Sequence, residues 1–364
     1  MENRYTVRTY LMFSLGLLAA VFRADGAAVE NDPVFPGKTW ESVPPETLGM
    51  NREKLEAART YALSAEGAGY IARHGKLVMA WGPVEKTYDL KSTSKSIGMT
   101  AVGLALMDGK LNLEDKAIRY QPDLGIDSEH PEVSAANRAT GWLGEITLEH
   151  LATQTAGFDK PGGYTKLLFQ PGTRWFYSDG GPNWLAECVT LAYGVDIETL
   201  LFDRVFTEIG IRRGVDLRWR KHAYRSKELH GIRRCEFGSG VHANVDAMAR
   251  IGYLYLRRGT WKGKQLLPAS FVDRATQPVD WVRPLPEHGD AKHGNASSHY
   301  GLLWWNNGDG TLANVPRDAY WSWGLYDSLI FVVPSLDIVA ARRRIALCGV
   351  APVLRADCVG RGKW

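Results

Sequence analysis

Strand-like apolar runs lie near the two ends of the chain, and helical patterns fill the region between them. Near the amino end, the runs at residues 69–73 and 77–81 are separated by a His-Gly-Lys turn, which predicts a β-hairpin. Because both ends supply strands, we expect them to pair in one sheet, with a helical part facing it. The late strand-like runs are at residues 300–306, 320–323, 329–333 and 337–341.

Most of the other apolar positions follow the helical period. Residues 94–106 are apolar almost all round and end at Asp108-Gly109, which predicts a buried central helix with a glycine after its last turn. From residue 111 to about residue 234 the pattern is helical with long loops, which predicts a helical subdomain. Two more helices are expected, at residues 51–63 and 245–257.

The composition is that of a globular protein with a large core. Of the 364 residues, 45% are hydrophobic and 23% are charged, and we find no internal repeat or low-complexity run. Residues 34–341 are therefore interpreted as a single domain, with residues 342–364 as a divergent tail. The net charge of +4 is small and the basic residues are scattered, except for three arginines at residues 342–344, so we expect no nucleic-acid partner.

The first 28 residues have the order of a secretory signal peptide. Arg4 and Arg8 precede an apolar stretch at residues 11–22, and small residues follow. About 12 apolar residues are too few to span a bilayer, which needs about 20, so no stable membrane anchor is expected. We predict that residues 1–28 are a signal peptide and that the protein is exported, to the periplasm or the medium.

The cysteines do not predict a metal site. They form no C-x-x-C pair and have no histidine at metal-ligand spacing. In an oxidising compartment the last two are near enough in sequence to close a small loop, but spacing alone does not decide the pairing. The four positions are Cys188, Cys235, Cys348 and Cys358.

The first candidate for chemistry is an S-x-x-K sequence, Ser92 to Lys95, at the start of the buried helix. If the helix begins there, the Ser92 hydroxyl and the Lys95 amine lie on one face, one turn apart. The helix N-terminus also offers N–H groups and a positive dipole end to an oxyanion. Taken alone the motif is weak, because a capping serine beside a solvated lysine is the common alternative.

Two later segments strengthen this interpretation. Tyr177-Ser178-Asp179 precedes a helix start, where the Tyr177 phenol would face Ser92 as a proton relay. In the segment Ser322-Trp323-Gly324-Leu325, the glycine would let a substrate approach a strand edge closely, and Leu325 would supply a second oxyanion N–H.

Together these residues make the sequence resemble the class C β-lactamase-related family, which includes penicillin-recognising enzymes, family esterases and 6-aminohexanoate-dimer hydrolases. The resemblance implies an α/β (α+β) fold of the β-lactamase/transpeptidase type. Such a fold has an antiparallel sheet flanked by helices and an all-helical subdomain, with the active site between them. The segments that carry the resemblance are residues 90–97, 150–157, 171–179, 241–259 and 325–334.

The resemblance also implies a mechanism, in which an acyl group is transferred to Ser92 and water then releases the acid. No metal or organic cofactor is needed for this chemistry, and the partner is a small ester or amide substrate. The implied site residues are Ser92, Lys95 and Tyr177 as catalytic groups, Ser92 and Leu325 at the oxyanion, and Asp179, Trp323 and Gly324 beside the substrate.

Two departures from the family pattern affect these expectations. The family usually has Asn where this chain has Asp179, and a carboxylate near Lys95 would favour its charged form and oppose its role as a base, which makes Tyr177 the stronger candidate. The family also has Lys or His ahead of the glycine in its last motif, whereas this chain has Ser322 and Trp323. Without that cation, substrates with an apolar acyl part are favoured over those with a carboxylate.

Three functions therefore remain in order of preference. The first is a serine hydrolase for small esters or amides, and the second is a β-lactamase or D-alanyl carboxypeptidase. The third, from another class, is a non-catalytic binding protein on the same fold, which Asp179 keeps open. No oligomeric state is predicted.

Overall fold

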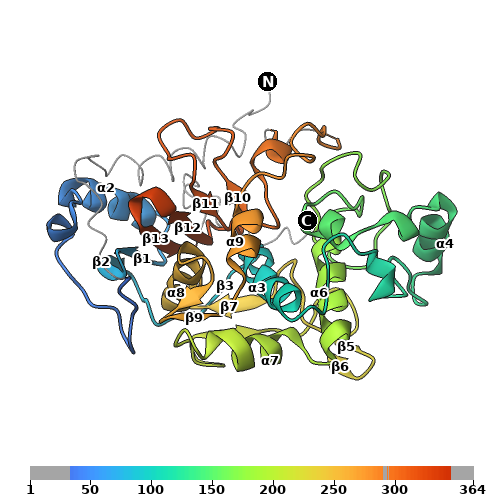
Figure 1. Cartoon of the computed structure of the whole chain (residues 1–364), viewed down its shortest axis with the longest axis horizontal. Helices are drawn as coiled ribbons and strands as arrows, with labels where there is room; N and C mark the ends of the chain where they lie inside the picture. Colours follow the sequence, from blue (N-terminus) through green and yellow to red (C-terminus); the bar gives the residue numbers. More distant parts are fainter. Residues whose placement is uncertain (1–32, 290–292, 294, 346–364) are drawn as a thin grey trace, which may run out of the picture.

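The computed structural model describes residues 33–289, 293 and 295–345. Its largest sheet contains six strands, in the order β10-β11-β12-β13-β1-β2, and all neighbours are antiparallel. The early hairpin β1-β2 pairs with the late strand β13, so both ends of the domain meet in one sheet as predicted (Figure 1). The strands are β1 Ala68–Arg73, β2 Lys76–Trp81, β10 Trp305–Asn306, β11 Tyr320–Trp321, β12 Leu329–Val333 and β13 Ile338–Arg343.

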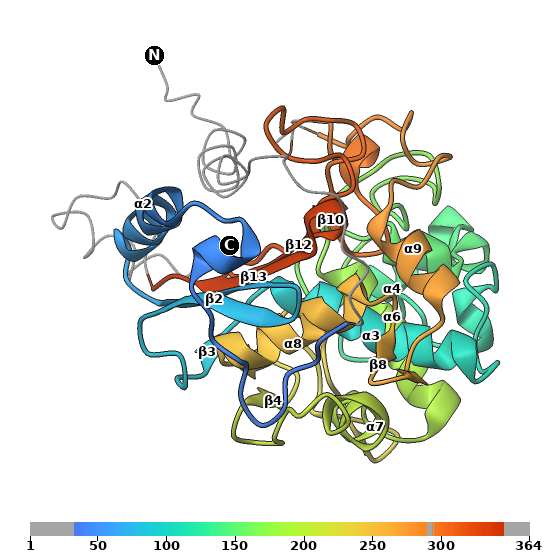
Figure 2. The same cartoon turned by 60° about the vertical axis from the view of Figure 1, so that its left-hand side comes forward.

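Helices lie on both sides of this sheet. The helix α8 (Val245–Leu256) packs on β1, β12 and β13, while α2 (Arg52–Leu63) lies on the other side (Figure 2). Close packing of α8 depends on Gly252, because a Cβ there would lie 2.7 Å from a methyl of Ile330 and 2.8 Å from one of Val339. The sheet is thus buried on both faces, and all residues of β12 and β13 are buried.

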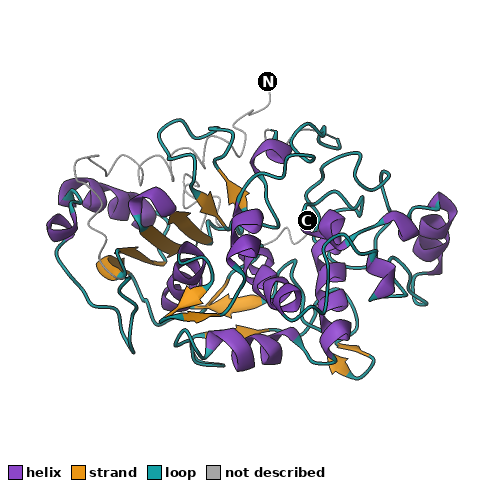
Figure 3. Ribbon diagram, in the orientation of Figure 1, coloured by secondary structure: helices purple, strands orange, loops and turns teal. Residues whose placement is uncertain are grey.

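The predicted central helix is α3 (Thr93–Met107), which lies between the sheet and the helical part (Figure 3). Its residues from Thr93 to Ala105 are all buried, and Gly109 after its end has a left-handed φ of +64°, as predicted for a glycine at this place. On its far side α3 contacts α6, α7 and α9. The remaining helices are α4 Pro131–Thr140, α5 Leu148–Ala152, α6 Gly180–Tyr193, α7 Ile197–Leu201 and α9 Ala269–Thr276.

The predicted helical subdomain also contains short strands. Strand β4 and the hairpin β5-β6 lie within it, and β4 pairs with β7, which also pairs with β3 in a three-stranded sheet. A further hairpin, β8-β9, follows α8. These strands have two or three residues each, which is too short for an alternating pattern to be recognised in the sequence. They are β3 Tyr88–Asp89, β4 Leu217–Trp219, β5 Glu228–Leu229, β6 Ile232–Arg233, β7 Val241–Ala243, β8 Thr260–Trp261 and β9 Lys264–Gln265.

The last strand extends beyond the boundary expected at residue 341, since β13 continues to Arg343. Two buried arginines are accommodated there because Asp327 pairs with Arg342 at 3.1 Å and with Arg344 at 2.9 Å. The predicted signal peptide, most of the tail and two of the four cysteines lie outside the described residues. Within those residues, Cys188 and Cys235 are buried free thiols, and no helix is long and apolar enough to cross a membrane.

Candidate active site

Ser92 lies immediately before the first turn of α3. The turn that presents it is held by Asp89, which accepts the N–H of Lys91 at 3.0 Å and pairs with its ammonium at 2.7 Å. Lys91 has a left-handed φ of +52°, which costs a non-glycine residue about 1–2 kcal/mol. Among the described residues, the N–H of Ser92 has no backbone acceptor, so this group at the helix N-terminus is available to a ligand.

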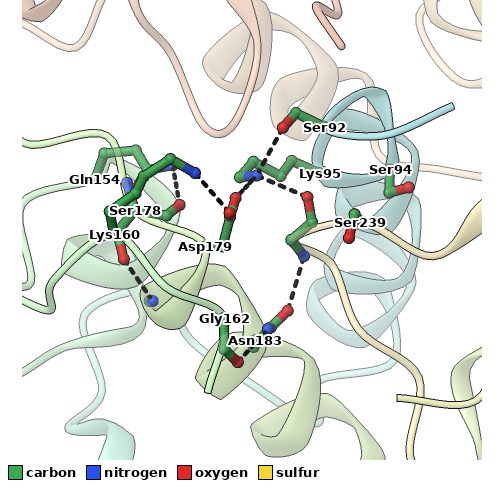
Figure 4. Close-up of polar contacts among 12 residues, drawn as sticks. Ser92, Ser94, Lys95, Gln154, Lys160, Gly162, Ser178, Asp179, Asn183 and Ser239 are labelled. Atoms are coloured by element: carbon green, nitrogen blue, oxygen red, sulfur yellow. Dashed lines mark hydrogen bonds and ion pairs between the residues drawn. The ribbon is translucent and has the colours of Figure 1, made fainter. Parts of the chain in front are cut away.

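Lys95 lies one turn further along the helix and uses all its donors inside the protein. Its Nζ lies 3.3 Å from Ser92 Oγ and 2.7 Å from the carbonyl oxygen of Gly238, and it forms an ion pair with Asp179 (Figure 4). An ammonium has three N–H donors and no acceptor, so these three contacts engage every donor that a charged Lys95 offers. Since the side chain is only 2% exposed, water has little access to it.

Asp179 precedes α6 but does not cap it. Its carboxylate lies between two ammonium groups, with Oδ1 on Lys95 and Oδ2 at 2.5 Å from Lys160. Burial alone would raise the pKa of Asp179, but the positive charges of both lysines and their hydrogen bonds hold it below its ordinary value. The carboxylate predicted to oppose Lys95 as a base is therefore in direct contact with it.

Tyr177 lies beside Lys95 and Ser92. Its ring lies 4.9 Å from the Lys95 ammonium, and its hydroxyl interacts with the Ser92 side chain. Burial, reinforced by the negative charge of Asp179, raises the pKa of Tyr177 to about 12, although Lys160 and the Ser92 hydrogen bond act in the other direction. A phenol with a pKa raised in this way is protonated at neutral pH, which favours Tyr177 as a proton donor and relay; its expected role as the base stays a prediction.

Lys160 is a residue of the site that the sequence did not reveal. It lies in the loop before α6, and its carbonyl oxygen accepts the N–H of Asp179 at 2.9 Å. Two hydrogen bonds tie the same loop to the start of α6. Ser178 Oγ donates to the carbonyl oxygen of Asp159, and Asn183 Nδ2 donates to that of Gly162 at 2.9 Å (Figure 4). A lysine in a Lys-Pro-Gly-Gly loop has no periodic or motif signal, so only the folded path of the chain brings it to Asp179.

Gln154 was also missed, and it fixes the loop that carries Tyr177. Its side-chain amide donates to the carbonyl oxygen of Ser178 and accepts the Ser178 N–H, both at 3.0 Å. Its own carbonyl oxygen accepts the N–H of Phe176 at 2.9 Å. The segment at residues 150–157 belonged to the resemblance, but nothing in the sequence alone assigned this contact.

The segment Ser322 to Leu325 reaches the start of α3 from the sheet. Ser322 points at the helix, with its Oγ 3.2 Å from Thr93 Oγ1, and not at a substrate. Gly324 is needed because a Cβ there would lie 2.2 Å from the carbonyl oxygen of Leu90, so packing of the chain on itself already requires a glycine here; its expected role beside the substrate stays a prediction. Leu325 is 52% exposed, and among the described residues its N–H makes no backbone hydrogen bond.

Aromatic rings line one side of the site. Tyr177 stacks on Trp305 with ring centroids 6.0 Å apart, and Trp323 meets the same tryptophan edge to face at 5.6 Å. Trp323, expected beside the substrate, is thus held in a continuous aromatic wall that includes the relay phenol. We name this set, Tyr177, Trp305 and Trp323, the aromatic wall.

The buried carboxyl of Glu236 lies near Lys95. Glu236 is fully buried, with Arg220 Nη1 at 2.7 Å from one of its oxygens. Burial raises the pKa of Glu236 to about 7, and the charge of Asp179 adds to this while Arg220 and Lys95 oppose it. No cluster of metal-ligating side chains is found in the described part of the chain.

Comparison with known proteins identifies this arrangement. The family model described as Beta-lactamase matches residues 55–342. An uncharacterised protein of Alkalihalophilus pseudofirmus is 23% identical over 75% of this chain and 78% of its own length.

Solved structures agree on the fold. A protein of Bacillus anthracis with the assigned name 6-aminohexanoate-dimer hydrolase superposes with a TM-score of 0.61 at 16% identity, over 92% of this chain and 88% of the other. Simvastatin synthase of Aspergillus terreus superposes with a TM-score of 0.57 at 17% identity, over 83% and 93%. At such identities the likeness concerns the fold, but the family model spans most of the chain, and the protein belongs to the β-lactamase family.

Proposed function

We propose that this protein is a serine hydrolase that cleaves a small ester or amide through an acyl-enzyme on Ser92. The observation that carries the proposal is the 3.3 Å contact between Ser92 Oγ and Lys95 Nζ at the N-terminus of a buried helix. A hydroxyl in contact with an amine, next to unpaired N–H groups, is the arrangement that nucleophilic acyl transfer requires. The β-lactamase family consists of serine hydrolases of this kind, which supports the proposal.

In the proposed reaction, Ser92 Oγ attacks the acyl carbon and its proton passes to Lys95. The N–H groups of Ser92 and Leu325 hold the oxyanion, and Tyr177 passes a proton to the leaving group as its bond to the acyl carbon breaks, then regains a proton from Lys95. Water then attacks the acyl carbon and its proton passes through the same groups to Ser92 Oγ, so that the acid leaves and the Ser92 hydroxyl is restored. Lys95 must release its own proton before it accepts one, and Asp179 opposes that release.

The aromatic wall supports small esters or amides as the substrate class, because it offers apolar surface next to the nucleophile. The absence of a basic residue at Ser322 and Trp323 argues against the β-lactamase or D-alanyl carboxypeptidase alternative. We expect short-chain aryl esters to be hydrolysed faster than a chromogenic cephalosporin. The reverse order would favour the alternative.

A non-catalytic binding protein is the second candidate, and one observation favours it. Lys95 has each of its three donors engaged, so the resting site holds no free base next to Ser92. In either case we propose an exported protein, on the basis of the signal peptide predicted for residues 1–28.

A fluorophosphonate probe distinguishes the two candidates without knowledge of the substrate. For a hydrolase we expect one labelled peptide, containing Ser92, with labelling that increases toward alkaline pH. Labelling should be lost in Ser92→Ala and kept in Ser239→Ala, a matched hydroxyl deletion nearby in the site (Figure 4). Folded protein that stays unlabelled from neutral to alkaline pH would support the binding protein.

A further inference from the structure

The two lysines on Asp179 differ in the donors they have left. Lys95 has three acceptors and is 2% exposed. The Lys160 ammonium has one acceptor among the described residues, Asp179 Oδ2 at 2.5 Å, and its side chain is 47% exposed. Since an ammonium carries three N–H donors, two of those on Lys160 face solvent and are available to a ligand.

These free donors lie next to the nucleophile. The Lys160 Nζ is 5.1 Å from the ring centroid of Tyr177, whose hydroxyl interacts with the Ser92 side chain. The ammonium is also well positioned, because the backbone of Lys160 accepts the N–H of Asp179 at 2.9 Å while its side chain binds the carboxylate of the same residue. A substrate group that reaches Lys160 is therefore within the same site as the bond to be cleaved.

The unused donors of Lys160 favour an anion. Lys95 and Lys160 carry two positive charges, which Asp179 and Asp159 balance, and the Asp159 carboxylate is already engaged by the backbone N–H of Lys160 at 2.6 Å. The other cations close to the site are committed to their own carboxylates, Lys91 to Asp89 and Arg220 to Glu236. Both oxygens of Asp179 already accept hydrogen bonds from ammonium groups, so the group that remains free to recognise a substrate here is a donor.

We propose that Lys160 binds a carboxylate on the acyl part of the substrate, so that the site selects half-esters or half-amides of dicarboxylic acids. The inference rests on the proposed hydrolase function and specifies its substrate class. We assign the carboxylate to the acyl part because the acyl part stays on Ser92 through both steps. A carboxylate there is stabilised by Lys160 in acylation and in deacylation. Lys160 comes from the loop before α6, on the helical side, so it does not restore the cation missing before Gly324 on the sheet side. It changes the expected apolar acyl part into one that ends in a carboxylate.

The test compares two substrates with one leaving group. The mono-4-nitrophenyl ester of glutaric acid carries a carboxylate, and 4-nitrophenyl valerate is its neutral counterpart of similar length. We expect Lys160→Met to lower the ratio of kcat/KM for the anionic ester to that for the neutral ester by about tenfold or more, which is the range of one charge-assisted hydrogen bond. Lys160→Arg should retain most of the ratio. Lys166→Met removes the same charge from an exposed position in the same connection and should leave the ratio unchanged.

A second comparison separates binding by Lys160 from repulsion by an unpaired Asp179. The ratio should also fall when Lys160→Met is added to an Asp179→Asn background. A ratio that falls only when Asp179 is intact would overturn the inference, as would an unchanged ratio in the single variant. If both esters are cleaved while the ratio does not respond, the substrate class is wrong and the hydrolase stands. If neither ester is cleaved and Ser92 is not labelled, the proposed function itself fails.

Discussion

The contact between Asp179 and Lys95 makes a specific prediction about pH. Replacement of Asp179 by Asn keeps the shape of the side chain and removes its charge. The ammonium of Lys95 then loses the ion pair that stabilises it, and it lies near Lys160 without the carboxylate that now separates the two positive charges. Both changes favour release of the Lys95 proton, so the rising limb of the pH–rate profile should move to lower pH.

The size of the shift follows from the geometry. An opposite charge within about 4–6 Å changes a proton equilibrium by about 1–3 pH units, and each unit corresponds to about 1.4 kcal/mol. The Lys95 side chain is 2% exposed, which favours the upper part of that range, whereas Asp179 is 22% exposed and shares its charge with Lys160. We therefore expect a shift of about 1–2 units, so that on the rising limb the variant is about 10–100 times faster than the wild type.

The assay is kcat/KM for an aryl ester from about pH 5 to pH 10, with thermal unfolding of each protein as a check on folding. Asp159→Asn is the matched control, because it removes a carboxylate one residue from Lys160 while an Asn oxygen can still accept the Lys160 N–H. Its limb should stay within a few tenths of a unit of the wild type. A profile of Asp179→Asn that coincides with that of the wild type, or moves to higher pH, would refute the reasoning and remove Lys95 as the titrating base.

Two further perturbations test the surroundings of the site. Gly324→Ala places a methyl group 2.2 Å from the carbonyl oxygen of Leu90, so the turn before Ser92 must move. We expect kcat/KM to fall at least about tenfold and the free energy of unfolding to fall by about 1–3 kcal/mol. Gly37→Ala, where a Cβ has no atom within 4 Å, should change neither quantity. Glu236 has a pKa raised from 4.5 to about 7, so the wild type loses stability as pH rises between these two values, because the unfolded chain ionises this carboxyl first, and the loss is constant above them. Urea unfolding should therefore show Glu236→Gln gaining up to about 3 kcal/mol relative to the wild type between pH 4.5 and about pH 8. A pH-independent difference would contradict the assignment.

The features that the sequence predicted share a clear physical origin. The hairpin β1-β2, the buried helix α3 and the strands β12 and β13 are long enough to impose their apolar period on the chain, so their existence and type were predictable. Strands of two or three residues, such as β5 and β6, leave no period and were absorbed into a helical prediction. The expected end at residue 341 was too early because a buried arginine looks polar until its partner Asp327 is known.

Of the site residues, too, only some were predictable from the sequence. The nearness of Ser92 and Lys95 follows from helix geometry, which any S-x-x-K at a helix start would share. The conflict between Lys95 and Asp179 was predictable from charge type once the motifs were aligned, and the contact confirms it. Lys160 was not, because it lies 19 residues before Asp179 and meets it only through the path of a glycine-containing loop.

The pairing of β1 with β13 has a consequence for how the protein reaches its working state. Ala68 lies opposite Arg343, so pairing of β1 with β13 closes nearly the whole domain into one loop. The conformational entropy of that loop must be lost before the hydrogen bonds between the two strands can form. Strand β13 also follows the hairpin that brings Gly324 to the Leu90 carbonyl oxygen. A growing polypeptide therefore carries Ser92, the proposed nucleophile, for most of synthesis without the sheet that completes the site around it. Capture of a mechanism-based probe by Ser92 would accordingly report the moment at which folding ends, and not merely that the helix bearing the serine has formed.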